Sequence, residues 1–154
     1  MLNPFRRKPQ ALPAVGGPFE FHQPWARASS HPVPSNIAGA FLGITNKGPG
    51  DDRLISARST AAESIELYGI KVVGPDIEMR PMQAGLAVPA GLTMTLKPRG
   101  YHLLLRDVSA PLQKGTTVPI TLTFEKAGAL TVDFAVEEPG LIGEAILNEE
   151  HHRG

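Results

Sequence analysis

Cysteine is absent from this sequence of 154 residues. Its absence excludes disulfides, thiolate metal sites and cysteine nucleophiles, so a soft-metal site must use methionine sulfur and histidine nitrogen. No apolar run approaches the length of a transmembrane helix, which argues against insertion into a membrane. Basic and acidic residues number 15 each, and the net charge of +0 provides no overall field that would attract nucleic acid.

The motifs of common enzymes are missing as well. The chain has no Gly-x-Ser-x-Gly elbow, no HExxH sequence and no phosphate-binding P-loop. Two adjacent acidic pairs are present, Asp51 with Asp52 and Glu137 with Glu138. We expect them to be solvated, because neighbours on a strand point to opposite faces and turn residues are usually exposed. An enzyme is therefore the class of protein that the sequence supports least.

Glycine and proline are frequent, at 16 and 15 residues, and they recur between short apolar runs. This spacing is typical of an all-β domain with many turns. Hydrophobic residues make up 42% and charged residues 19%, which is the composition of a globular chain. The sequence therefore predicts one all-β domain, either a β-sandwich or a Greek-key barrel.

The clearest hairpin lies near the end of the chain. Apolar residues alternate with threonines before the turn EKAG and alternate with polar residues again after it. Period-2 alternation on both sides of a short glycine-containing turn predicts two antiparallel strands with one buried face. The apolar positions are Val118, Ile120, Leu122 and Phe124 before the turn, and Leu130, Val132, Phe134 and Val136 after it.

The same patterns divide the chain into three parts. Residues 1–18 contain four prolines and predict a flexible lead-in, residues 19–137 the β-domain, and residues 138–154 a C-terminal extension. Within that extension, residues 139–148 have the spacing of a short amphipathic helix. Further strands are expected at 19–27, 37–46, 53–58, 63–73, 77–82, 86–88, 92–96 and 101–106.

Strand geometry groups the candidate functional residues. Residues i and i+2 on a strand share a face, so His102 lies with Leu104, and Tyr68 lies with Ile70. Both pairs are expected on the face opposite to the core. Met79 belongs to the short strand between them in sequence.

Several phrases follow one another between about Trp25 and Val136. They are WARAS, GDDRLISA, IELYGI, EMRPM, GLAVPAG, LKPRGYHLLL, PLQKGTTVPITLTFEKAG and LTVDFAV. In order and spacing they resemble periplasmic copper chaperones of the PCu(A)C type. The resemblance implies a cupredoxin-like β-barrel with a surface Cu(I) site of two histidines and two methionines, which delivers copper to a terminal oxidase.

The resemblance carries over to two of the four ligand positions. Met79 and His102 match a family methionine and a family histidine, so the resemblance implies that they contact Cu(I). Tyr68 and Ile70 stand where the family has a His-x-Met pair, and Leu104 stands where it has its other methionine. Cu(I) favours thioether and imidazole donors, so this reduced site is expected to bind copper more weakly than a complete one.

Other histidines and methionines have no position assigned by the sequence. A methionine in a β-domain usually fills the core, which is the favoured interpretation of Met94, and terminal histidines are usually solvated. The residues whose role stays open are His22, His31, Met82, Met94, His151 and His152.

Two hypotheses about function follow. In the first, the protein carries Cu(I) through Met79 and His102, with an oxidase subunit or another copper carrier as its partner. In the second, copper binding is lost, and an apolar patch of Tyr68, Ile70 and Leu104 docks a partner protein or a second copy, unless the C-terminal extension covers it. The resemblance implies a periplasmic location, whereas the sequence shows no signal peptide and leaves the cytoplasm as the alternative.

Overall fold

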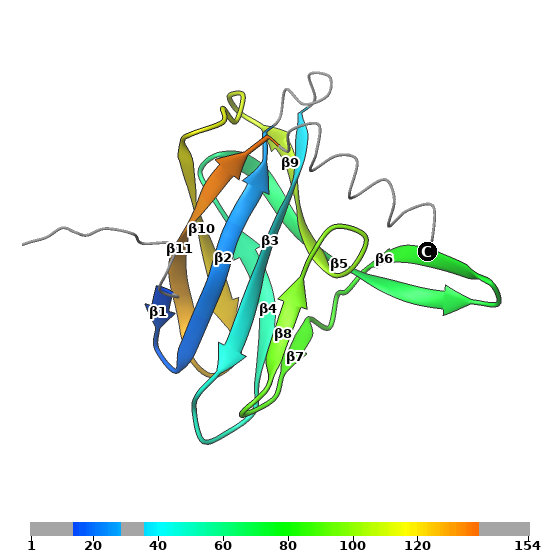
Figure 1. Cartoon of the computed structure of the whole chain (residues 1–154), viewed down its shortest axis with the longest axis vertical. Helices are drawn as coiled ribbons and strands as arrows, with labels where there is room; N and C mark the ends of the chain where they lie inside the picture. The colour runs from blue at the N-terminus through cyan, green and yellow to red at the C-terminus, as the bar shows by residue number, and fades with distance from the viewer. Residues whose placement is uncertain (1–13, 29–35, 139–154) are drawn as a thin grey trace, which may run out of the picture.

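The structure, a computed structural model, describes residues 14–28 and 36–138. Within these residues eleven β-strands belong to one sheet (Figure 1). None of the described residues forms a helix long and apolar enough to cross a membrane. The strands are β1 (Ala14–Gly16), β2 (Phe19–Arg27), β3 (Ile37–Asn46), β4 (Asp52–Arg58), β5 (Ala62–Val73), β6 (Asp76–Pro81), β7 (Leu86–Val88), β8 (Thr93–Leu96), β9 (His102–Val108), β10 (Thr117–Phe124) and β11 (Gly128–Glu137).

Seven of these strands close into a barrel. They follow the order β2, β11, β10, β4, β5, β9 and β3, and a pairing of β3 with β2 completes the ring. The sheet is mixed, because β11 pairs in parallel with β2 while β10 and β11 are antiparallel. The all-β prediction is therefore confirmed, and of the two predicted architectures the chain adopts the closed barrel.

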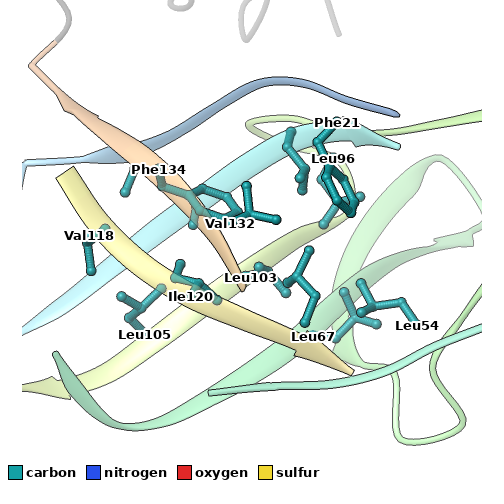
Figure 2. Close-up of a cluster of buried hydrophobic side chains, with 14 of the residues drawn as sticks. Phe21, Leu54, Leu67, Leu96, Leu103, Leu105, Val118, Ile120, Val132 and Phe134 are labelled. Atoms are coloured by element: carbon teal, nitrogen blue, oxygen red, sulfur yellow. The ribbon is translucent and has the colours of Figure 1, made fainter. Parts of the chain in front are cut away.

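The barrel interior is filled by the alternating apolar residues of its strands (Figure 2). In the predicted hairpin, Val118 faces Phe134 and Ile120 faces Val132, and all four side chains are buried. At one end Phe124 stacks on Phe19, with 4.2 Å between ring centroids. Each such side chain contributes about 1.5–3 kcal/mol through its removal from water, so this interior dominates the stability of the fold.

Most predicted strands agree with the structure to within one or two residues. A difference occurs at the N-terminus, where β1 pairs with β2 although it lies inside the segment predicted as a lead-in. The alternation rule missed it because a strand of three residues shows no periodicity. The helix expected at residues 139–148 lies outside the described residues, as do His31, His151 and His152.

The expectation of a solvated acidic pair is wrong for Asp52. Its side chain is buried, and its two carboxylate oxygens accept hydrogen bonds from the backbone N–H groups of Arg53, Lys126 and Ala127 at 2.7 to 3.0 Å. Burial by itself raises the pKa of the Asp52 carboxyl, but these N–H donors together lower it below its ordinary value of 3.8. Asp52 thus holds the turn between β10 and β11 against the start of β4.

Candidate functional site

The candidate residues gather on the outer surface of β5 and its two neighbours. β9 pairs with one edge of β5 and β6 pairs with the other. Tyr68 of β5 lies directly opposite His102 of β9, and Ile70 of β5 lies directly opposite Met79 of β6. Directly opposed residues of an antiparallel pair share a face, so all four side chains leave the same side of the sheet.

A row of aromatic rings from β2, β3, β9 and β5 extends along the outside of the barrel to this surface. Trp25 of β2 lies 4.6 Å from Phe41 of β3, Phe41 lies 6.4 Å from His102, and His102 stacks on Tyr68 with centroids 5.6 Å apart and planes 12° from parallel. Phe41 is buried although it is not part of the barrel interior, because its neighbours in the row cover it. The imidazole of His102 is therefore held between two rings.

A hydrogen bond fixes the tautomer of His102 when the ring is neutral. Its Nδ1 lies 2.9 Å from the carbonyl oxygen of Gly100. A carbonyl can only accept, so Nδ1 carries the proton and Nε2 keeps its lone pair. Metal-binding histidines commonly use one nitrogen for such an orienting bond and the other for the ion.

The Tyr68 hydroxyl is engaged on the other side of the site. Arg106 donates from Nη2 to the Tyr68 oxygen at 3.0 Å and from Nε to a Glu66 carboxylate oxygen at 2.7 Å. The hydrogen bond that Arg106 donates to Glu66, followed by the one it donates to Tyr68, raises the pKa of the Arg106 guanidinium above its usual range. Arg106 is therefore a cation at neutral pH, and the Tyr68 oxygen accepts a hydrogen bond from it.

Leu104 has a more polar setting than the predicted patch. Its direct partner on β5 is Glu66, which forms the ion pair with Arg106, and the Leu104 side chain is half-buried. The apolar surface therefore extends from Tyr68 toward Ile70 and Met79 rather than toward Leu104.

Beyond Tyr68, β5 and β6 project from the barrel as a two-stranded hairpin (Figure 1). Its turn fits a II′ type, because Gly74 has a φ of 59° and the following Pro75 has its φ set by its ring. One face of the hairpin is apolar throughout, and we call it the hairpin apolar face. It consists of Tyr68, Ile70 and Val72 on β5, and of Ile77, Met79 and Pro81 on β6.

Met79 and His102 lie on the same face but on opposite sides of β5. Strands are spaced about 4.8 Å apart and rise about 3.3 Å per residue, so two strand spacings and a two-residue offset separate the Cα atoms by about 12 Å. Both side chains must lean across β5 to reach one ion. Met79 is 41% exposed, which leaves its flexible side chain free to do so.

The other sulfur and imidazole groups of the described chain lie elsewhere. Met82 and Met94 pack against the barrel interior, which agrees with the core interpretation of Met94. His22 uses its Nε2 in a 2.9 Å hydrogen bond with the hydroxyl of Thr45. Neither methionine belongs to the outer surface that carries Tyr68, Ile70 and Met79.

Sites for harder ligands are not formed in the part of the chain that the structure describes. No group of three or more His, Cys, Asp or Glu side chains in residues 14–28 and 36–138 is arranged around one point. A surface pocket of about 190 Å³ lies beside Asp51 and Asp52. The carboxylates of Asp51 and Asp52 are already engaged, since Asp51 accepts from the N–H of Ala90 and Asp52 accepts from three backbone groups.

The sequence predicted which site residues share a face but missed several members of the surface. Phe41 was overlooked because it stands between buried Ala40 and buried Leu42 in a strand that is apolar on both faces. Val72 and Ile77 were taken as ordinary strand residues, although they are 70% and 52% exposed. Val72 is two residues from Ile70 and Ile77 is two residues from Met79, so each shares a face with its neighbour, and this spacing could have identified them.

Comparisons with known proteins agree with the fold. Residues 19–136 match the family described as "LpqE-like: Putative lipoprotein LpqE-like". A putative lipoprotein, Lxx21020 of Leifsonia xyli subsp. xyli (strain CTCB07), is 30% identical over 114 residues, which are 74% of this chain and 66% of that protein. The chain thus spans just under two thirds of the length of this curated relative.

Solved structures with the same fold come from copper-binding domains. The copper-bound PCuAC domain of PmoF2 is 28% identical with a TM-score of 0.67, over 82% of this chain and 98% of that domain. The apo PCuAC domain of PmoF1 is 26% identical with a TM-score of 0.70, over 82% and 99%. The Cu(I) form of DR1885 from Deinococcus radiodurans is 28% identical with a TM-score of 0.59, over 75% and 76%.

These findings define the class of protein, an all-β barrel of the PCuAC type, and confirm the resemblance seen in the sequence. Because the family match covers most of the chain, the protein belongs to the LpqE-like family.

Proposed function

We propose that this protein binds Cu(I) through Nε2 of His102 and the thioether of Met79, and passes the ion to another copper protein. The observation that carries the proposal is the hydrogen bond from His102 Nδ1 to the carbonyl of Gly100, which leaves Nε2 as a lone-pair donor on the outer surface. Similarity to the copper-bound PmoF2 domain and to the Cu(I) form of DR1885 supports it.

The donor set suits Cu(I) better than harder ions. Imidazole and thioether groups are the ligands that Cu(I) selects in the absence of cysteine. The Tyr68 oxygen is directed at the Arg106 cation, where a metal ion would be repelled, so Tyr68 is a stacking support for His102 rather than a ligand. With two protein ligands the site is expected to bind weakly, which suits an ion that must be passed on.

The partner and the compartment are part of the same proposal. A shallow, exposed site of this kind is open to a copper-accepting oxidase subunit or to another copper carrier that supplies further ligands. Membership of a family described as putative lipoproteins favours a location outside the cytoplasm, such as the periplasm.

Titration of the purified protein with Cu(I) against a competing chelator tests the proposal. We expect His102→Ala and Met79→Ala each to weaken binding at least about 10-fold, because even an indirect partner of a metal site contributes that much. His22→Ala and Met94→Leu are matched controls that should leave the affinity unchanged, since His22 is hydrogen-bonded to Thr45 and Met94 packs against the barrel interior. A wild-type affinity no higher than that of the Met79→Ala, His102→Ala double variant would contradict copper binding here.

A second function is favoured by the exposure of the hairpin apolar face. Ile70, Val72, Ile77 and Met79 are 39–70% exposed, and contiguous exposed apolar residues commonly mark a protein-binding surface. In this alternative the barrel is a docking module without copper. Tyr68→Asp and Ile70→Asp should then abolish association in sizing and pull-down experiments, while Lys71→Ala on the opposite face should have no effect. Association that survives both aspartate substitutions would rule out this surface.

A further inference from the structure

Strand β6 has a free edge. It pairs with β5 on one side, and no other described strand pairs with its second side. All six of its residues are exposed. A free edge presents backbone donors and acceptors that another strand can satisfy, so the identity of the outward groups decides what it can pair with.

The register identifies those outward groups. Met82 donates its N–H to the carbonyl of Leu67 at 2.7 Å, just beyond the end of β6. Hydrogen-bonded positions alternate along an antiparallel strand, so Glu78 and Arg80 also direct their backbone groups toward β5. Ile77, Met79 and Pro81 direct theirs outward. Ile77 and Met79 therefore offer both a donor and an acceptor, and Pro81 offers an acceptor.

We propose that β6 pairs with β6 of a second copy of this chain, antiparallel and centred on Met79. In this register Met79 faces the partner's Met79 and exchanges two backbone hydrogen bonds with it. Ile77 faces the partner's Pro81, and its N–H donates to that residue's carbonyl; the symmetry-related bond forms at the other end. Because Pro81 has no N–H, one hydrogen bond is absent at each end of the pairing, and the two bonds at its centre are kept.

Charge complementarity selects this register over its neighbours. With Met79 at the centre, Glu78 lies opposite the partner's Arg80, and the reciprocal pair forms by symmetry. Such directly opposed pairs of unlike charge stabilise an antiparallel sheet. The adjacent register centred on Glu78 would oppose Glu78 to the partner's Glu78, and the one centred on Arg80 would oppose Arg80 to the partner's Arg80, so both place like charges opposite each other.

Within one chain these charges already form an ion pair. Arg80 donates from Nε and Nη2 to one oxygen of Glu78 at 3.2 and 2.8 Å. The second Glu78 oxygen is then available to the partner's Arg80. Pairing would join two single ion pairs into a network of four charges on one face of the extended sheet.

The pairing is independent of copper binding. A two-fold axis perpendicular to the sheet keeps both hairpin apolar faces on the same side, away from Glu78 and Arg80. Met79 therefore keeps its side chain on the copper-binding surface in the dimer. The inference goes beyond the proposed function and does not rest on it.

Sedimentation velocity of the full chain over a concentration series tests whether the free edge of β6 forms the dimer. We expect a reversible monomer–dimer equilibrium for the wild type. Ile77→Pro removes the outward N–H without touching the bonds to β5, and it should raise the dimer dissociation constant about 10- to 30-fold, since two hydrogen bonds are lost. Ile77→Ala keeps the N–H and should dimerise much more tightly than Ile77→Pro. A monomer at every concentration, or equal weakening by alanine and proline, would overturn the proposal.

The register is tested by exchanging charges. Arg80→Glu should weaken the dimer about 10-fold, because Glu78 would face the partner's glutamate twice. Adding Glu78→Arg to this variant restores both unlike pairs and should return the dissociation constant to within about threefold of the wild type. Failure of the double exchange to restore pairing would reject the register centred on Met79.

Cu(I) titration of the same variants separates this inference from the proposed function. Glu78 and Arg80 offer no soft donor, so their variants should keep the wild-type copper affinity whatever their oligomeric state. Loss of copper binding in His102→Ala with an intact dimer would leave the pairing standing. A copper-binding monomer would leave the proposed function standing and reject the pairing.

Discussion

The two halves of β5 have the same local structure and opposite surroundings. From Ala62 to Gly69 the strand belongs to the barrel wall, and Leu67 points into the interior and is buried. From Ile70 to Val73 every residue is exposed, although the residues are as apolar as those in the wall. The difference shows that apolar strand residues are buried only where a second layer of structure lies against them.

The position at which the strand changes character is Gly69. It is buried, and a Cβ atom there would come within 2.8 Å of Cγ of Met82 and 3.2 Å of the Tyr101 ring. Met82 and Tyr101 therefore close the end of the barrel over Gly69. Beyond it, among the residues that the structure describes, β6 pairs with no strand other than β5.

The contrast predicts that substitutions in the barrel cost far more stability than substitutions in the hairpin. The largest effect is expected for Phe124→Ala, because this ring stacks on Phe19 and lies 6.4 Å from Phe21. The loss should be about 3–5 kcal/mol in the free energy of unfolding, measured by urea denaturation. A loss below 1 kcal/mol would mean that the three rings do not form a tightly packed cluster.

A smaller loss of stability is expected when the Asp52 carboxylate, which joins β4 to the turn between β10 and β11, is removed. Asp52→Ala leaves three backbone N–H groups without their carboxylate and should cost about 2–3 kcal/mol at pH 7. Asn at this position restores part of the hydrogen bonding and should cost less. Thermal or urea unfolding of both variants distinguishes the roles of charge and of shape.

The pH dependence of this loss has a definite sign. The folded-state pKa of Asp52 is below its ordinary value of 3.8, so its stabilising contribution is complete above that value. It is lost as the pH falls through the lower folded-state pKa. The stability difference between wild type and Asp52→Ala should therefore be constant from neutral pH to about 5 and shrink below about 4. A difference that grows on acidification would contradict this account.

At the boundary, Gly69→Ala is expected to cost about 1–3 kcal/mol through overpacking against Met82 and Tyr101. Because Met82 is a flexible side chain, combining the substitution with Met82→Ala should cost less than the sum of the two single variants. A double-mutant cycle measured by urea unfolding gives this coupling. Additive losses would show that Met82 does not cover Gly69.

The smallest effects are expected in the hairpin. Val72→Ser and Ile77→Ser should each change the free energy of unfolding by at most about 0.5 kcal/mol, because both residues are more than half exposed. The same substitution at buried Val88 is the control and should cost several times more. A large loss at Val72 would indicate that another part of the molecule covers the hairpin apolar face.

Much of the site was predictable because strand parity is a local property. The alternation in IELYGI and YHLLLR placed Tyr68 with Ile70 and His102 with Leu104, and the barrel keeps these faces. Parity cannot show how strands pair, so the stacking of Tyr68 on His102 and the ion pair of Glu66 with Arg106, which are far apart in sequence, were not foreseen. The burial of Asp52 was missed for the same reason, since two of its three donors lie more than seventy residues away.

The sequence by itself determined the all-β class, the main strands and the resemblance to copper chaperones, because each depends on short patterns or ordered phrases. The tertiary structure decided which His102 nitrogen is available, that Arg106 holds the Tyr68 hydroxyl, and that Met79 lies on a projecting hairpin. These features arise where β5 meets β9 and β6. Pairing between strands is set by the closure of the whole barrel, and no single stretch of residues specifies it.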